Sequence, residues 1–81
     1  MAEIFYKESV ERDLRKIDKK QRERIQNKIE KELIKQPKGK KLKGEFQGLF
    51  SCRVGEYRVI YTKISRGLLI LRVGHRKDVY L

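Results

Sequence analysis

The segment LFSCRVGEYRVIY at residues 49–61 contains two runs of β-branched and aromatic residues, one on each side of Gly55-Glu56. Such runs are typical of strands, and a two-residue type II′ turn favours glycine at its first central position. The segment therefore predicts a β-hairpin whose turn fixes the register. The expected cross-strand pairs are Val54 with Tyr57, Cys52 with Val59, and Phe50 with Tyr61.

A third strand is predicted at residues 68–73, after Ser65-Arg66-Gly67. This tripeptide fits a three-residue loop with its glycine in the left-handed conformation. The loop then pairs Tyr61 with Leu71 and Val59 with Val73. One face of the predicted sheet is apolar and is expected to pack on helices, with Cys52 as a small buried hydrophobic residue.

The opposite face of this sheet collects arginines. It is expected to hold Leu49, Ser51, Arg53, Arg58, Ile60, Thr62, Ile70 and Arg72. The register places Arg53 directly opposite Arg58, and Arg72 on the next strand beside Ile60, while no acidic residue falls on the face. Like charges in a cross-strand pair are destabilising. We therefore favour an anion site over a solvated arginine face, since arginine contacts phosphates bidentately.

The N-terminal part of the chain predicts a short strand at residues 3–7 and two amphipathic helices. Ser9 is expected to cap the first helix, and Asp18 with Gln21 forms a capping box for the second. Helical spacing places two apolar stripes toward the core: Val10, Leu14 and Ile17, then Ile25, Ile29 and Leu33. Pro37 ends the second helix, and residues 38–48 are expected to form a lysine-rich loop.

These elements predict an α+β fold. In it, an N-terminal strand and an antiparallel two-helix hairpin pack on an antiparallel β-sheet. At 81 residues the chain is expected to form a single domain, residues 1–81.

Charge sets the class of partner. Lys plus Arg number 22 and Asp plus Glu 11, which gives a net charge of +11. The net charge is +2 over residues 1–34 (10 basic, 8 acidic) and +9 over residues 35–81 (12 basic, 3 acidic). A segregated positive field indicates a binding face for nucleic acid or an acidic protein.

Several classes are excluded by composition. No apolar run is long enough to span a bilayer and the N-terminus does not resemble a signal peptide, so we expect a cytoplasmic protein with no membrane partner. One cysteine excludes an internal disulfide, and one histidine with one cysteine argues against a zinc site. Because no carboxylate pair and no phosphate-binding glycine motif stand out, a nuclease with this sequence is expected to use no metal and no cofactor.

The C-terminal segment VGHRKDVYL at residues 73–81 contains the only histidine, His75. Histidine suits proton transfer near neutral pH, but His75 could equally be an ordinary residue at the end of a strand. Tyr80 could stack on a nucleic-acid base or close the edge of the core.

Four tracts of the chain resemble the RelE/ParE toxin superfamily, and the RelE branch most closely. They are LKG at 42–44, GL at 48–49, RVGEYRVIY at 53–61 and VGHRKDVY at 73–80. The resemblance implies the toxin of a type II toxin–antitoxin pair, an endoribonuclease (mRNA interferase) that cleaves mRNA on the ribosome and arrests translation. It also implies a RelB-like antitoxin, with operator DNA bound only through the antitoxin complex.

The resemblance assigns roles to individual residues. Arg58 contacts the scissile phosphate, Arg76 assists the leaving group or the transition state, and Tyr80 orients the substrate by stacking. Arg53 occupies a position where relatives carry a lysine proposed as the base. Because arginine keeps its proton, this substitution makes His75 the candidate base or acid. Further contacts to RNA or the ribosome are expected from Lys40, Lys41, Lys43, Arg72 and Lys77.

Together these roles predict metal-free cleavage through attack of the ribose 2′-hydroxyl on the adjacent phosphate. Two other functions stay open. One is a ParE-like inhibitor of DNA gyrase, and the other is a non-catalytic basic RNA-binding module.

Overall fold

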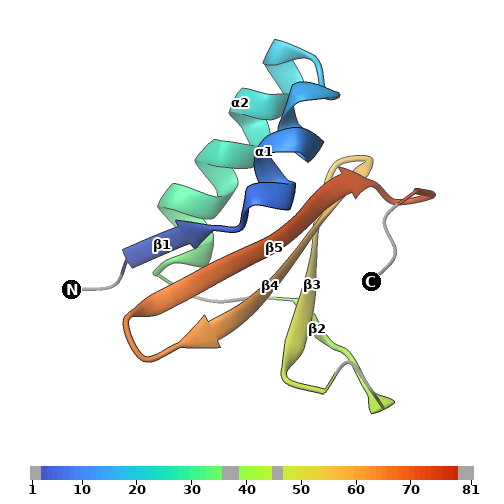
Figure 1. Ribbon diagram of the computed structural model, residues 1–81. Coiled ribbons are helices and arrows are strands. Elements are labelled where there is room, and N and C mark those ends of the chain that lie inside the picture. The colour runs from blue at the N-terminus through green and yellow to red at the C-terminus, as the bar shows by residue number, and fades with distance from the viewer. Residues whose placement is uncertain (1–2, 36–38, 45–46, 79–81) are drawn as a thin grey trace.

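The computed structural model describes residues 3–35, 39–44 and 47–78 (Figure 1). In chain order the elements are β1 (Glu3–Tyr6), α1 (Glu8–Arg15), α2 (Lys19–Asn27), the π-helix η1 (Lys28–Leu33), β2 (Lys40–Lys41), β3 (Leu49–Val54), β4 (Tyr57–Ile64) and β5 (Gly67–His75). They confirm the α+β fold and the antiparallel helix pair. No helix in the described ranges is both long enough and apolar enough to cross a membrane.

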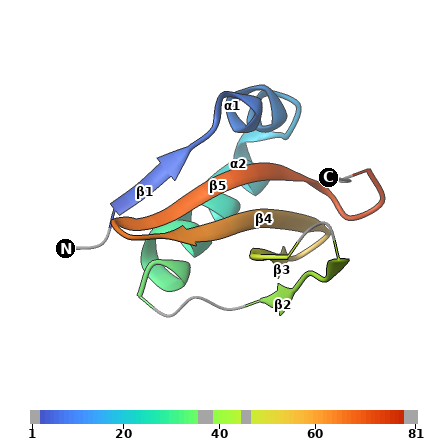
Figure 2. The same ribbon diagram turned by 60° about the horizontal axis from the view of Figure 1, so that its bottom comes forward.

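The sheet is mixed rather than antiparallel. Its five strands lie in the order β1-β5-β4-β3-β2 (Figure 2), with β1 parallel to β5 and the other neighbours antiparallel. The prediction of a purely antiparallel sheet was therefore wrong for β1. This strand precedes the helices in the chain, and the long connection through them brings the chain back in the direction that a parallel pair requires.

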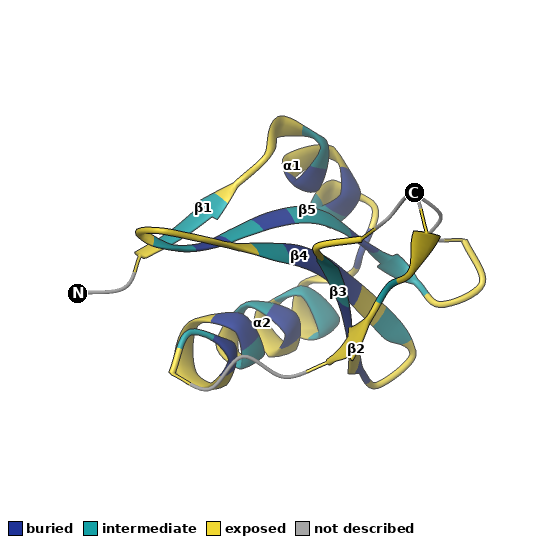
Figure 3. Cartoon of the chain, turned by 90° about the horizontal axis from the view of Figure 1, so that it is seen from below, coloured by how far each residue is buried: buried dark blue, intermediate teal, exposed yellow. Residues whose placement is uncertain are grey.

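One face of the sheet packs on the helix formed by α2 and η1, whose buried positions face the strands in Figure 3. Ile25, Ile29 and Leu33 are at most 1% exposed, as the four-residue repeat predicted. Asp18 accepts a hydrogen bond from the backbone N–H of Gln21 at 3.4 Å, which confirms the predicted cap. The predicted stop at Pro37 lies outside the described residues.

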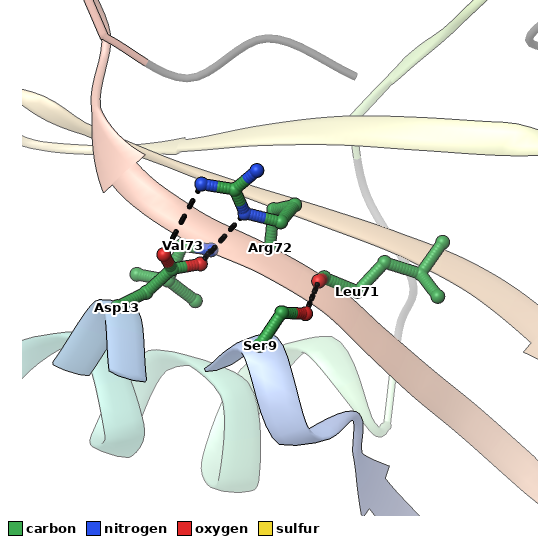
Figure 4. A network of polar contacts seen from close by, with 5 residues as sticks. All are labelled: Ser9, Asp13, Leu71, Arg72 and Val73. Carbon is green, nitrogen blue, oxygen red and sulfur yellow. Dashed lines mark hydrogen bonds and ion pairs between the residues drawn. The ribbon is translucent and has the colours of Figure 1, made fainter. Parts of the chain in front are cut away.

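The first helix begins two residues earlier than predicted, and Ser9 does not cap it. Lys7 is the N-cap, while Ser9 lies inside α1 and its hydroxyl donates to the backbone carbonyl of Leu71 at 2.8 Å (Figure 4). The pairing of β1 with β5 ends at Ile70, so α1 lies beside the next part of the β5 edge. Ser9 therefore satisfies a backbone group of β5 instead of one at its own helix end.

The β3–β4 hairpin has the predicted register throughout, and Gly55 has a φ of 60° that fits the first central position of a type II′ turn. The predicted β4–β5 loop is wrong, because Ile64 pairs directly with Gly67 and leaves a two-residue turn. Gly67 belongs to β5, and a Cβ there would clash with the Glu3 carbonyl. Close approach of β1 therefore explains this glycine.

A β-bulge changes the register between β4 and β5. Val59 pairs with Val73 and Ile60 with Arg72 as predicted, but Tyr61 pairs with Ile70. Leu71 is thus an additional residue on β5. The bulge overturns the Tyr61–Leu71 pair and moves Ile70 from the arginine face to the core, where it is 0% exposed.

Two further predictions concern β3 and its neighbour β2. Cys52 of β3 is 5% exposed within the core, as expected. Residues 40–41 lie in the predicted loop but form β2, with Lys40 opposite Ser51 and Lys41 opposite Phe50. Opposed residues share a face of a sheet, so Lys40 is placed on the arginine face and Lys41 on the other.

Candidate functional site

Arg53 and Arg58 lie directly opposite each other on β3 and β4, on the face of the hairpin opposite that of the buried Cys52 and Val59. Arg58 Nη1 donates to the Ser51 hydroxyl at 3.4 Å, and Arg53 Nε donates to the Gly55 carbonyl at 3.4 Å. Neither guanidinium has a carboxylate within 4.0 Å among the residues described. Within the described ranges, the hydrogen-bond partners of these two arginines are therefore neutral oxygens.

Arg72, in contrast, is paired with Asp13 of α1 (Figure 4). Its Nε and Nη2 donate to the two carboxylate oxygens at 2.9 and 3.2 Å, and the Val73 backbone N–H donates to Asp13 at 2.9 Å. The hydrogen bond to Asp13 raises the pKa of Arg72, although partial burial acts in the opposite direction. The expectation that no carboxylate would meet these arginines is wrong here, because sequence spacing did not show that α1 covers the β5 edge.

A second carboxylate, Glu56, lies in the turn between Arg53 and Arg58. Its Oε2 is 3.7 Å from His75 Nε2 and 3.8 Å from Arg76 Nε. The Arg76 backbone N–H also donates to the Glu56 carbonyl at 2.9 Å, which brings the end of β5 against the hairpin turn. Arg76 thus also has an acidic neighbour.

His75 has a defined orientation in this cluster. Its Nδ1 accepts a hydrogen bond from the Lys77 backbone N–H at 3.2 Å, so the neutral ring carries its proton on Nε2, toward Glu56. The ring also contacts Tyr57 edge-on, with centroids 5.8 Å apart. Glu56 and Tyr57 are site neighbours that the sequence reasoning missed; the pairing of Tyr57 with His75 could have been found by extending the predicted register.

The remaining predicted residues differ in their placement. Lys40, Lys41, Lys43 and Lys77 are all exposed. Lys40 lies opposite Ser51, the residue that contacts Arg58, whereas Lys77 follows β5. Tyr80 lies outside the described residues. The structure thus divides the predicted residues near the β3–β4 turn into two groups. Arg53 and Arg58 oppose each other on one face of the sheet. His75 and Arg76 lie beside Glu56, and His75 pairs with Tyr57 on the opposite face from Arg58.

A family model matches nearly the whole chain. The sequence model described as "ParE toxin of type II toxin-antitoxin system, parDE" matches residues 4–80. The chain belongs to this toxin family. The expectation of a RelE/ParE superfamily toxin is confirmed.

Individual relatives of this toxin carry RelE-type names. It is 46% identical over 44 residues to Toxin RelG of Mycobacterium tuberculosis, an alignment that covers 52% of the chain and 51% of RelG. The chain therefore spans about half the length of the curated relative it matches.

Two solved structures are similar over nearly the whole toxin. The toxin–antitoxin complex RelBE2 of Mycobacterium tuberculosis has a chain with a TM-score of 0.86 and 30% identity, over 93% of this chain and 98% of that one. A chain of the RelB–RelE antitoxin–toxin complex of Methanococcus jannaschii has a TM-score of 0.72 and 25% identity, over 94% of each chain. Both structures agree with the strand and helix arrangement found for this toxin.

Proposed function

We propose that the toxin is a ribosome-dependent endoribonuclease that cleaves mRNA and so inhibits translation. The observation that supports this most directly is the Arg53–Arg58 pair. The two arginines oppose each other across β3 and β4, and neither has a carboxylate partner in the described structure. Such a pair costs folding energy, and a phosphodiester between the two would offset that cost with charge-assisted hydrogen bonds.

The proposed reaction uses the nucleophile that RNA itself supplies. The ribose O2′ attacks the adjacent phosphorus and loses its proton, the bond from phosphorus to O5′ breaks, and O5′ takes a proton. The products are a 2′,3′-cyclic phosphate and a 5′-hydroxyl. Because the nucleophile is internal, the step requires no metal-activated water. Arg53, Arg58 and Arg76 would stabilise the negative charge that builds on the phosphorane.

His75 is the candidate for proton transfer in this reaction. Its Nε2 lies 3.7 Å from Glu56 Oε2, while its Nδ1 accepts a hydrogen bond from the Lys77 backbone N–H. To donate the Nε2 proton to O5′ as it leaves, His75 would have to be in the imidazolium form, in which Nδ1 is protonated as well and gives up the Lys77 contact. Tyr80 remains the candidate for stacking on a base next to the cleaved bond.

The same charges suggest the partners. We propose that a RelB-like antitoxin, such as those named in the two similar complexes, neutralises the toxin, and that operator DNA is bound only through this complex. Lys40 extends the arginine face toward β2 and, with Lys41, Lys43 and Lys77, would contact mRNA or ribosomal RNA. A cytoplasmic location is part of this proposal, because translating ribosomes are the target.

Primer extension on mRNA-programmed ribosomes tests the proposal. Arg58→Ala is expected to lower the cleavage rate by about 10²–10³-fold, the loss typical of removing one group that stabilises transition-state charge. Arg66→Ala is the matched control. Arg66 is an exposed arginine of the β4–β5 turn paired with Glu3, and its removal should leave cleavage unchanged. Equal rates for Arg58→Ala and wild type would refute the assignment.

A second candidate function is inhibition of DNA gyrase, which the description of the matching family model favours. A supercoiling assay run beside the cleavage assay separates the two. Loss of supercoiling without any cut RNA would refute the nuclease proposal and support gyrase inhibition. Salt-sensitive RNA binding with neither effect would instead indicate a non-catalytic RNA-binding module.

A further inference from the structure

A groove of about 470 Å³ lies between the α2–η1 helix and the β3–β4 turn. The helix contributes long polar side chains, and the hairpin contributes the residues that lead into the turn. The groove is lined by Arg24, Asn27, Lys28, Lys31, Glu32, Arg53, Val54 and Gly55. It lies beside the candidate site but, apart from Arg53, shares none of its residues.

The charge of the groove is strongly positive. Its lining contains four cationic side chains and one carboxylate, Glu32. This carboxylate pairs with Lys28 at 3.2 Å. Within the described structure no carboxylate lies within 4.0 Å of the other three cations: Arg24, Lys31 and Arg53. Four positive charges against one negative charge leave the groove with a net charge of +3.

Gly55 connects the groove to the candidate site. Arg53 Nε donates to its carbonyl at 3.4 Å, and Arg24 Nη1 lies 3.4 Å from the position that a Cβ on Gly55 would occupy. Two guanidinium groups therefore flank one glycine, one from the strand and one from the helix. Arg53 lines the groove and also opposes Arg58, so a chain of phosphates could pass from one set of cations to the other.

We propose that this groove binds the phosphate backbone of an RNA strand that continues past the Arg53–Arg58 pair. The proposal rests on the proposed function, in which the substrate is RNA. An acidic peptide would use apolar anchors in addition to charge, and Val54 is the only large apolar residue in the lining. A polyanion held by Lys and Arg alone needs no such anchors.

The local helix geometry agrees with a binding role. Lys28 and Lys31 belong to η1, where the backbone N–H of Ile34 donates to the carbonyl of Ile29, five residues back, at 3.2 Å. Turns of this π type are rare and are frequent at functional sites. Here the π turn supplies the two lysines that face the hairpin.

Salt-dependent binding of an uncleavable RNA tests the groove. The probe is a fluorescein-labelled single-stranded 2′-O-methyl oligonucleotide, which lacks the 2′-hydroxyl nucleophile, measured by anisotropy between about 50 and 200 mM KCl. The groove variant is Arg24→Gln with Lys31→Gln. The control is Arg12→Gln with Lys20→Gln, the same charge change on exposed helix positions outside the groove.

Losing two phosphate contacts should reduce the slope of log Kobs against log salt concentration by about 1.4, at about 0.7 for each single-strand phosphate. The control should keep the wild-type slope. Equal slopes for the two double variants would overturn the proposal, as would a wild-type toxin that does not bind the probe. A groove variant that loses binding to polyglutamate but keeps the RNA slope would assign the groove to an acidic protein instead.

This result is separable from that of the cleavage assay. The probe cannot be cut, so its slope is independent of catalysis. If wild-type toxin fails to cleave mRNA on ribosomes while the groove and control variants still differ in slope, the nuclease function is refuted and the groove is supported as an RNA site. If cleavage is observed and the two variants have equal slopes, only the groove proposal is refuted.

Discussion

Replacing Asp13 is expected to weaken the whole fold, although Asp13 lies on a short surface helix. Its carboxylate is 9% exposed and accepts three hydrogen bonds from the β5 edge. Two of these come from the Arg72 guanidinium and one from the Val73 backbone. Asp13→Ala leaves that backbone group and the guanidinium without their partner.

The size of the effect follows from these contacts. Removing one partner of a buried ion pair costs about 3–5 kcal/mol, but the Arg72 side chain is 39% exposed and water replaces part of the loss. We therefore expect Asp13→Ala to lower the free energy of unfolding by about 2–4 kcal/mol. For a domain of this size the melting temperature should fall by at least about 8 °C. Asp13→Asn keeps an acceptor for the Val73 N–H and should lose only about 1–2 kcal/mol.

Urea denaturation at neutral pH measures these values. Glu11→Ala is the matched control: it removes an exposed carboxylate from the same helix, and its effect should stay within about 0.5 kcal/mol. A double-mutant cycle of Asp13→Asn with Arg72→Met isolates the pair. We expect a coupling energy of about 1.5–3 kcal/mol.

Two results would refute the reasoning. One is an Asp13→Ala variant as stable as the Glu11→Ala control, and the other is a coupling energy near zero. Arg72→Met also tests, independently of stability, whether Arg72 contacts RNA. Since Arg72 is occupied by Asp13, this variant should keep the wild-type salt dependence of RNA binding, whereas an Arg72 that contacts RNA would reduce the slope by about 0.7.

Two further predictions concern the β-sheet. Gly67→Ala should lower the free energy of unfolding by about 3 kcal/mol or more in urea denaturation, because its Cβ would clash with the Glu3 backbone. Gly44→Ala is the control. A Cβ at Gly44 would have no neighbour within 4 Å, so at a φ of 69° this variant should cost only about 1–2 kcal/mol. Burial, and next the charge of Cys52, raise the pKa of Tyr61 above 10.0, so the native state holds the phenol proton more tightly than the unfolded chain. This contribution is present below pH 10.0 and is lost as the pH rises through the folded pKa, so wild-type stability should fall more steeply above pH 10 than that of Tyr61→Phe.

The hairpin could be predicted in detail because a local feature determines it. Gly55-Glu56 admits one short turn, and that turn sets every pair from Val54–Tyr57 to Leu49–Thr62. The β4–β5 register could not be predicted from the sequence in the same way. The bulge at Leu71 arises where β1 stops and α1 takes over the edge of β5, a tertiary event with no sequence signal within the strand.

The site residues differ in the same way: a local turn places some of them, whereas others depend on the tertiary fold. Arg53 and Arg58 were placed together by the turn alone, and Ile60 beside Arg72 by counting along the strands. The partner of Arg72 was missed because Asp13 is 59 residues away in the chain. On a helical wheel Asp13 is one polar residue among many, and only the position of α1 against β5 distinguishes it.

The carboxylates explain why the positive charge is concentrated where it is. Two of the four arginines on or next to this face meet acidic groups: Arg72 meets Asp13, and Arg76 meets Glu56. Asp13 is part of the fold, since it also binds backbone, whereas Glu56 contacts Arg76 at 3.8 Å from an exposed turn and can be displaced by a phosphate at little cost. The net field at the hairpin therefore comes from Arg53 and Arg58, and a polyanion that reaches them can recruit Arg76 from Glu56. On this reasoning Glu56→Gln should strengthen RNA binding at little cost in stability, whereas Asp13→Asn, which also removes a carboxylate from an arginine, should lower stability.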